Sequence, residues 1–135
     1  METLLIDQDI PVFYIQAASF PEGVLEAHQK LHALIPFSAD RKYFGLSRPE
    51  NSSIVYQAAA EEKEDGEAEK LNCPTLLLKK GNYLNVTIKD FMQDPSSIGR
   101  AFQSLLTSPD LDPQGYCVEW YVNDQDVNCM IRLKE

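Results

Sequence analysis

Residues 43–51 read YFGLSRPEN and residues 116–124 read YCVEWYVND, and these two stretches decide the fold. When Tyr43 is superimposed on Tyr116, Ile54 falls on Val127 without any gap. Each stretch starts as an apolar strand, reaches turn residues and is followed by a second apolar strand. The sequence therefore predicts that one strand–turn–strand hairpin occurs twice.

One amphipathic helix is expected before each hairpin. Apolar side chains recur at helical spacing in residues 24–34 and again in residues 98–106, and the two stripes match when Val24 is superimposed on Ile98. The separation in the chain between matched helix residues is one residue longer than that between matched hairpin residues. The loop between helix and hairpin is therefore one residue shorter in the second half. Ser19 and Glu22 have the spacing of a capping box ahead of the first helix. Pro36 is expected to end that helix.

Strands ahead of the helices complete two units of the same order. One half covers about residues 8–60 and the other about residues 73–135, within a single domain of residues 1–135. Neither half could bury enough apolar area alone. The predicted fold class is α+β, a duplicated β-α-β-β unit with an antiparallel sheet, two helices on one side and a groove between pseudo-two-fold halves. A sandwich with unrelated halves is the alternative. The expected strands are 10–17, 43–46, 54–60, 75–78, 83–88, 116–122 and 127–133.

An acidic connector, residues 61–72, separates the two halves. Its first ten residues read EEKEDGEAEK and offer almost no apolar side chain to bury. Such a composition is typical of a solvated segment. We expect residues 61–70 to be exposed and mobile.

The charge balance argues against a direct nucleic-acid partner. The chain has 21 acidic and 12 basic residues, a net charge of −9, whereas DNA affinity depends on basic side chains that neutralise phosphates. The first residues lack the basic and apolar regions of a signal peptide, and no apolar run approaches the length of about 18 residues that a membrane span needs. We expect a cytoplasmic protein with no membrane partner.

No cofactor or metal site is expected. The three cysteines are an odd number at unrelated spacings, which favours reduced thiols over a disulfide framework. His28 and His32 have the i, i+4 spacing of metalloprotease motifs, but Gln29 stands where such a motif carries glutamate. A packed or solvated helix face explains the two histidines better than zinc.

Glu119 is a carboxylate within an otherwise apolar strand. Strand alternation places Cys117, Glu119 and Tyr121 on one face and Trp120 on the other. If the first face meets solvent, Glu119 is a polar strand residue. If that face lines a groove, the charge is partly desolvated and needs a partner: a ligand cation, Arg48 or a tyrosine hydroxyl.

The segment from Tyr116 to Asp124, followed by the strand at 127–133, resembles the end of a GyrI-like domain, the effector-binding domain of bacterial transcription activators. There, a strand carrying glutamate, any residue and an aromatic is followed by a turn and an alternating apolar strand. The hairpin of residues 43–58 resembles the corresponding part of the first repeat, and the likeness covers about residues 10–133. It implies a pocket between the halves, with a glutamate that meets cationic or polar aromatic ligands. The chain differs from the activators in having no helix-turn-helix and in its acidic insert.

These observations lead us to expect a stand-alone small-molecule (effector) binding domain for aromatic or cationic organic ligands, acting in transcription regulation or ligand sequestration. Aromatic walls with one carboxylate suit a flat organic cation. The first alternative, which the resemblance implies, is a hydrolase of reactive small molecules with Glu119 as general base and Tyr121 as proton donor. The second is an adaptor that binds a separate regulatory protein. The candidate ligand-binding residues are Glu119, Tyr121, Tyr56, Tyr83, Trp120 and Arg48.

Overall fold

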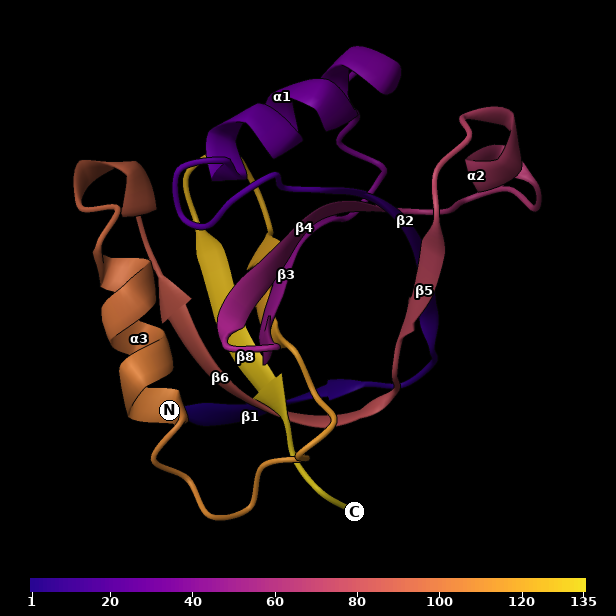
Figure 1. The fold of residues 1–135 in the computed structure, drawn as a ribbon. Coiled ribbons are helices and arrows are strands. Elements are labelled where there is room, and N and C mark those ends of the chain that lie inside the picture. Colours follow the sequence, from indigo (N-terminus) through magenta and orange to yellow (C-terminus); the bar gives the residue numbers. More distant parts are fainter.

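Eight strands form one antiparallel sheet that curls strongly, with helices outside the curl (Figure 1). The computed structural model describes residues 1–135. No helix combines the length and the apolar character that crossing a membrane requires. The elements are β1 (Glu2–Ile6), β2 (Ile10–Gln16), α1 (Val24–Leu34), β3 (Tyr43–Glu50), β4 (Ser53–Glu61), α2 (Glu67–Lys70), β5 (Thr75–Leu78), β6 (Gly81–Ile88), the short 3-10 helix η1 (Phe91–Gln93), α3 (Ser97–Leu105), β7 (Cys117–Tyr121) and β8 (Val127–Arg132).

The strand order confirms the predicted α+β fold with a duplicated unit. The order is β1-β6-β8-β7-β3-β4-β2-β5, with β3 and β7 paired at the centre. Outward from this seam come β3, β4 and β2 on one side and β7, β8 and β6 on the other. Both halves therefore have the chain order strand, helix, strand, strand.

The two edge strands are exchanged between the halves. β1 precedes the first unit in the chain but pairs with β6 of the second, and β5 precedes the second unit but pairs with β2 of the first. The sequence analysis did not predict β1. This strand depends on a partner in the other half of the chain, as the pairing of Leu4 with Tyr83 shows.

The sequence alignment of the central strands is one residue out of register. It matches Tyr43 with Tyr116, yet Tyr43 lies on the helix side of the sheet and Tyr116 packs inside the curl. Shifting the alignment by one position, to the separation that relates the helices, keeps matched residues on the same face. Gly45 then matches Glu119, and these two residues are themselves paired across the seam.

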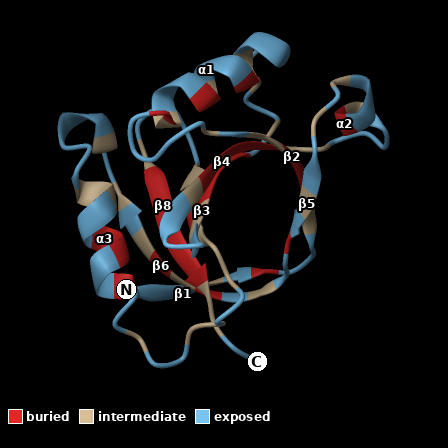
Figure 2. Ribbon diagram, viewed as in Figure 1, coloured by how far each residue is buried: buried red, intermediate tan, exposed pale blue.

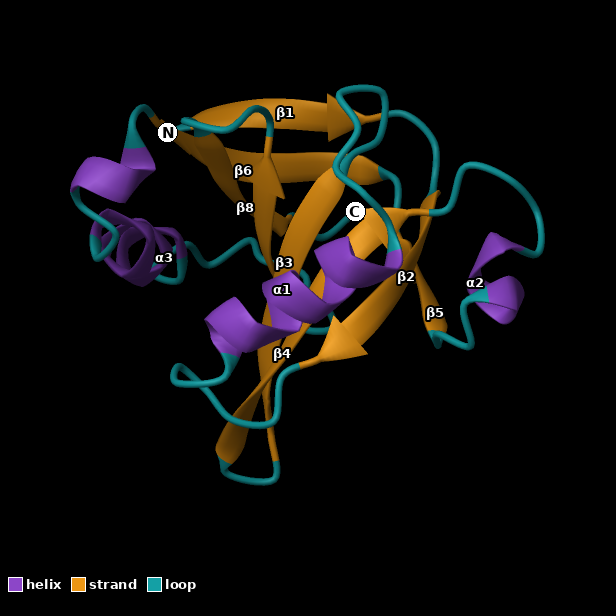
Figure 3. Ribbon diagram, turned by 90° about the horizontal axis from the view of Figure 1, so that it is seen from above, coloured by secondary structure: helices purple, strands orange, loops and turns teal.

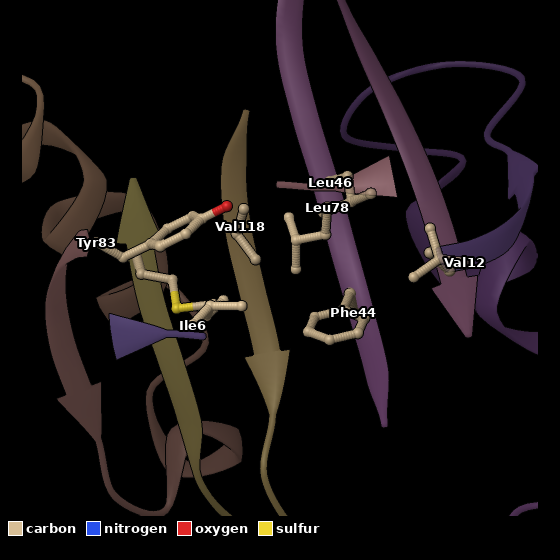
Figure 4. Packing of buried hydrophobic residues seen from close by; sticks show 9 residues of the cluster. Ile6, Val12, Phe44, Leu46, Leu78, Tyr83 and Val118 are labelled. Carbon is tan, nitrogen blue, oxygen red and sulfur yellow. The ribbon is translucent and has the colours of Figure 1, made fainter. Parts of the chain in front are cut away.

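Three apolar clusters hold the layers together, and the buried residues lie mainly in the strands and on the inward sides of α1 and α3 (Figure 2). The first cluster fills the inside of the curl, where side chains from many strands meet (Figure 4). The second lies under α1 and the third under α3. The inside cluster consists of Ile6, Val12, Phe44, Leu46, Ala59, Leu78, Tyr83, Val118 and Met130.

The two long helices cover different parts of the outer face of the sheet. α1 packs against β4 and β2, whereas α3 packs against β6 and β8 and lies to one side in the view from above (Figure 3). The predicted capping box is wrong: Gly23 is the N-cap of α1, and no side chain caps it. Residues 20–23 form a turn in which the Gly23 amide donates to the Ser19 carbonyl at 3.2 Å, so the chain already turns before the helix.

The sequence analysis expected the acidic connector to be exposed, but part of it is packed against the domain. It contains α2, and Ala68 of this helix is buried in the cluster under α1. The Arg41 guanidinium donates to both oxygens of Glu67, at 2.8 and 2.7 Å. A buried alanine and an ion pair therefore attach to the rest of the domain a segment whose composition is typical of a solvated chain.

Candidate functional site

A groove of about 550 Å³ opens between α1 and the segment around η1, over the seam where β3 and β7 meet. Each half contributes one strand residue to its floor, Tyr43 and Tyr121, which are paired with each other across the seam. The groove therefore lies between the halves. Its lining residues are Pro21, Glu22, Val24, Leu25, His28, His32, Phe37, Tyr43, Phe91, Met92, Pro95, Tyr121, Asn123 and Asp124.

Glu119 lies beneath this floor, on the helix side of β7. Its residue exposure is 8%, and it is one of few buried charged or polar residues in the protein. The Tyr56 hydroxyl donates to Glu119 Oε1 at 3.0 Å, and the Tyr121 hydroxyl donates to the same oxygen over a short distance. Two phenols from two strands thus solvate one carboxylate in the interior.

Gly45 makes room for this arrangement. It is paired with Glu119 across the seam, and the Tyr56 ring passes over it. A Cβ at this position would lie 2.0 Å from the Tyr56 hydroxyl oxygen and 2.8 Å from Glu119 Oε1. Only glycine leaves the space that both side chains occupy.

His28 links the groove to the buried carboxylate. Its Nε2 lies 2.8 Å from the Tyr56 hydroxyl oxygen, and its ring packs edge-on against the rings of Tyr56 and Tyr121 at centroid distances of 5.7 and 5.5 Å. The chain of contacts therefore runs from His28 through Tyr56 to Glu119. Only His28 and Tyr121 of these four residues also line the groove.

Burial shifts the pKa values in this network in opposite directions. It raises the pKa of Glu119, an effect that the hydrogen bonds from Tyr121 and Tyr56 partly offset. Burial, together with the nearby His32, lowers the pKa of His28 to about 4. The pKa values of Tyr56 and Tyr121 rise because their rings are buried and Glu119 is close. At neutral pH the imidazole is neutral and both phenols keep their protons.

The walls of the groove are aromatic and its formal charges are acidic. Phe37 stacks on Tyr43 with ring centroids 5.3 Å apart, and Phe91 packs against Tyr121 at 5.6 Å. Two carboxylates, from Glu22 and Asp124, belong to the lining, while no lysine or arginine does. Aromatic ring faces and carboxylates are groups that interact favourably with positive charge.

The structure brings three of the six candidate residues together: Glu119, Tyr121 and Tyr56 form one hydrogen-bonded group. The other three lie on the opposite face of the sheet and do not reach the groove. Tyr83 packs inside the curl, where its hydroxyl donates to the Lys79 carbonyl at 2.6 Å (Figure 4). Trp120 packs against Phe44 with centroids 6.2 Å apart.

Arg48 also points to the inner face and has partners of its own. Its guanidinium donates to Glu50 at 2.9 Å and lies 4.6 Å from the centre of the Tyr116 ring. Arg48 is therefore not the partner of Glu119, a role that the sequence analysis had left open.

The sequence analysis missed His28 as a groove residue, along with Tyr43, Phe91 and Met92. His28 was noted for its spacing from His32, and this spacing does place both imidazoles on the groove side of α1. The sequence gives less indication of η1, because Phe91 and Met92 come after a strand and show no helical periodicity. Their place in the groove depends on how η1 packs beside β7.

The site has no cluster of metal-ligating side chains and no activated thiol. No group of three or more His, Cys, Asp or Glu side chains is arranged to hold a metal ion. Burial and the nearby Glu119 raise the pKa of Cys117 to about 11 and of Cys129 to about 12, so both thiols stay protonated at neutral pH.

Comparisons with known proteins show the fold. No family model matches the chain, and no curated protein matches it. An integron cassette protein from the mobile metagenome of Vibrio cholerae superimposes with a TM-score of 0.73 at 12% identity, over 98% of this chain and 95% of that one. A Listeria innocua protein described as a hydrolase gives 0.59 at 11% identity, over 98% and 90% of the two chains. An uncharacterized conserved protein from Listeria innocua gives 0.60 at 11% identity, over 98% and 91%. This curled-sheet fold thus recurs in proteins of very different sequence.

Proposed function

We propose that this chain is a stand-alone binding domain for planar aromatic cations, of the GyrI-like effector-binding type, that acts in transcription regulation or ligand sequestration. One observation carries the proposal: an apolar, aromatic-walled groove whose formally charged lining residues are both carboxylates lies directly over a third, buried carboxylate. A buried carboxylate without a cation is costly, and a ligand cation in the groove offsets that cost.

The geometry suits a flat ligand. Phe37 with Tyr43 and Phe91 with Tyr121 supply aromatic rings on the two sides of the seam. Cation–π attraction favours a positively charged ring over a neutral one of the same shape. Glu119 adds long-range attraction through a region of low dielectric, where charges are poorly screened.

The test is calorimetric titration with N-methylacridinium, a tricyclic cation, and with neutral acridine at slightly alkaline pH. We expect the native protein to bind the cation more tightly. The variant Glu119→Gln keeps the shape and removes the charge, so it should weaken the cation by about ten- to a hundredfold. Its effect on acridine should be small.

The matched control is Glu64→Gln, which removes an exposed carboxylate of the acidic connector. It should leave both affinities unchanged. Equal losses for acridine and N-methylacridinium in Glu119→Gln would show that the carboxylate supports structure alone. If neither compound nor any wider panel of aromatic cations binds, the adaptor function becomes the better explanation.

Hydrolysis of a reactive small molecule is the second candidate function. It is favoured by the direct hydrogen bond from Tyr121 to Glu119, a donor and an acceptor placed side by side, and by the description of one structural neighbour as a hydrolase. Binding is the better supported function because Glu119 does not itself line the groove. Mass spectrometry of strained-ring electrophiles incubated with the protein would detect turnover, and loss of turnover in Glu119→Gln would support the hydrolase.

A further inference from the structure

His28 has one ring nitrogen that the internal network leaves free. Nε2 contacts the Tyr56 hydroxyl, whereas Nδ1 has no partner within the protein and is not among the buried polar atoms that lack one. Because His28 lines the groove, this accessible nitrogen belongs to the groove surface.

The protons of the network decide what this nitrogen can do. Tyr56 has a single hydroxyl proton, and it is donated to Glu119 Oε1. The contact between Tyr56 and His28 at 2.8 Å therefore needs the proton of His28 Nε2. A neutral imidazole that carries its proton on Nε2 has a lone pair on Nδ1. Nδ1 is thus a hydrogen-bond acceptor.

His32 provides a contrast within the same helix. It also lines the groove one turn further along α1, but its Nδ1 is buried without a partner and cannot meet a ligand in this arrangement. His28 alone of the two imidazoles has an accessible Nδ1 held in a fixed tautomer.

We propose that His28 Nδ1 accepts a hydrogen bond from an N–H group of the bound cation, so that the groove selects protonated aromatic amines and amidines over quaternary ammonium compounds. The proposal rests on the proposed function and names the class of cation. It also explains how Glu119 acts from beneath the floor: a ligand N–H at Nδ1 extends the chain through His28 and Tyr56 to the carboxylate. Hydrogen bonds in such a chain strengthen one another.

The test compares two tricyclic cations, protonated aminoacridine and N-methylacridinium, by calorimetric titration. The first has N–H groups and the second has none. In the native protein we expect aminoacridine to bind more tightly by about tenfold or more, as for a hydrogen bond to a charged group. His28→Phe keeps a ring between Tyr56 and Tyr121 but removes both nitrogens. It should abolish most of this preference, because aminoacridine loses much more affinity than N-methylacridinium.

Two further variants separate recognition from structure. Tyr56→Phe removes the oxygen that fixes the tautomer of His28, so it should reduce the preference for aminoacridine. Gln29→Ala, an exposed change next to His28 on the outer side of α1, should alter neither affinity. Nitrogen NMR of the native protein gives an independent reading: the free imidazole should be protonated on Nε2, and the Nδ1 resonance should shift with aminoacridine but not with N-methylacridinium.

The outcomes are distinct. Equal binding of the two cations, or a free imidazole protonated on Nδ1, would overturn this inference and leave the proposed function intact. A His28→Phe variant that loses both cations equally would show that the ring only packs. Failure of the native protein to bind either cation would overturn the proposed function, and this inference with it.

Discussion

Gly45 and Glu119 are paired across the β3–β7 seam, and the side chain that one lacks makes room for the carboxylate of the other. Their separation in the chain equals that between Val24 and Ile98, which relates the two long helices. The same structural position is therefore glycine in one half and glutamate in the other, at the point where the pseudo-two-fold halves meet. Two glutamates here would place like charges side by side, whereas one glutamate and one glycine give a single solvated carboxylate.

Because the Tyr56 and Glu119 side chains lie so close to Gly45, adding a single methyl group at this position should destabilise the protein. In Gly45→Ala the new Cβ would displace the Tyr56 hydroxyl, and because backbone and ring are both packed, we expect a loss of about 1–3 kcal/mol in the free energy of unfolding. Cation binding should weaken as well, since Tyr56 orients His28 and Glu119. Urea denaturation and titration with N-methylacridinium measure the two effects.

Gly99→Ala is the matched control for this change. Gly99 lies in α3, where a Cβ would meet no atom within 4 Å. Alanine is the better helix former, so this variant should gain about 0.5–1 kcal/mol. Similar effects of the two substitutions would contradict the role assigned to Gly45.

The sequence predicts the duplicated fold because local patterns specify it. The apolar stripes of α1 and α3 and the turn residues of both hairpins are short-range signals, and they are in the same order twice. β1 depends on pairing with β6, which no local pattern reveals. The one-residue shift at the seam has a similar cause: identity between Tyr43 and Tyr116 outweighed the requirement that matched strand residues face the same side.

Part of the candidate site could also be predicted. Alternation correctly placed Glu119 and Tyr121 on one face, and the same rule already placed Trp120 on the other. The sequence could place His28 on a helix face but could not reveal its connection to Glu119. That connection runs through Tyr56 and joins three separate elements of the fold. Contacts of this kind depend on tertiary packing.

The buried carboxylate predicts a gain in stability when its charge is removed. The folded-state pKa of Glu119 is raised above the unfolded value, so its contribution to stability is fully present below the unfolded pKa and is lost as pH rises through the folded one. The glutamine in Glu119→Gln does not titrate, so the variant does not lose this stability as pH rises. Its melting temperature should therefore match that of the native protein in acid and exceed it increasingly at higher pH. A variant that is less stable at every pH would show that the hydrogen bonds outweigh desolvation.

The packing of α2 predicts that the acidic connector contributes to stability. Ala68 is 3% exposed, so Ala68→Glu forces a charge into the cluster under α1 or expels the helix. We expect a loss of about 1–3 kcal/mol, measured by urea denaturation. Glu69→Gln changes the neighbouring exposed residue and should have little effect. Equal stability of both variants would restore the view of the segment as a loose link.

The depressed pKa of His28 predicts a loss of stability in acid that depends on this one side chain. The folded-state pKa is about 4, below the ordinary value of 6.5, so the unfolded chain binds a proton more readily between these values. The stabilising contribution is therefore present above pH 6.5 and is lost as pH falls toward 4, by an amount on the order of 2–3 kcal/mol. In His28→Phe this part of the pH dependence should vanish. Because His32 also has a lowered pKa, the native protein and the variant must be compared at each pH, so that its contribution cancels. Urea denaturation from pH 7.5 to pH 4, at intervals of about half a unit, gives the difference directly. A difference that does not vary with pH would show that the pKa of His28 is not lowered in the folded protein, so that the imidazole is protonated in mild acid and its Nδ1 cannot accept a hydrogen bond there.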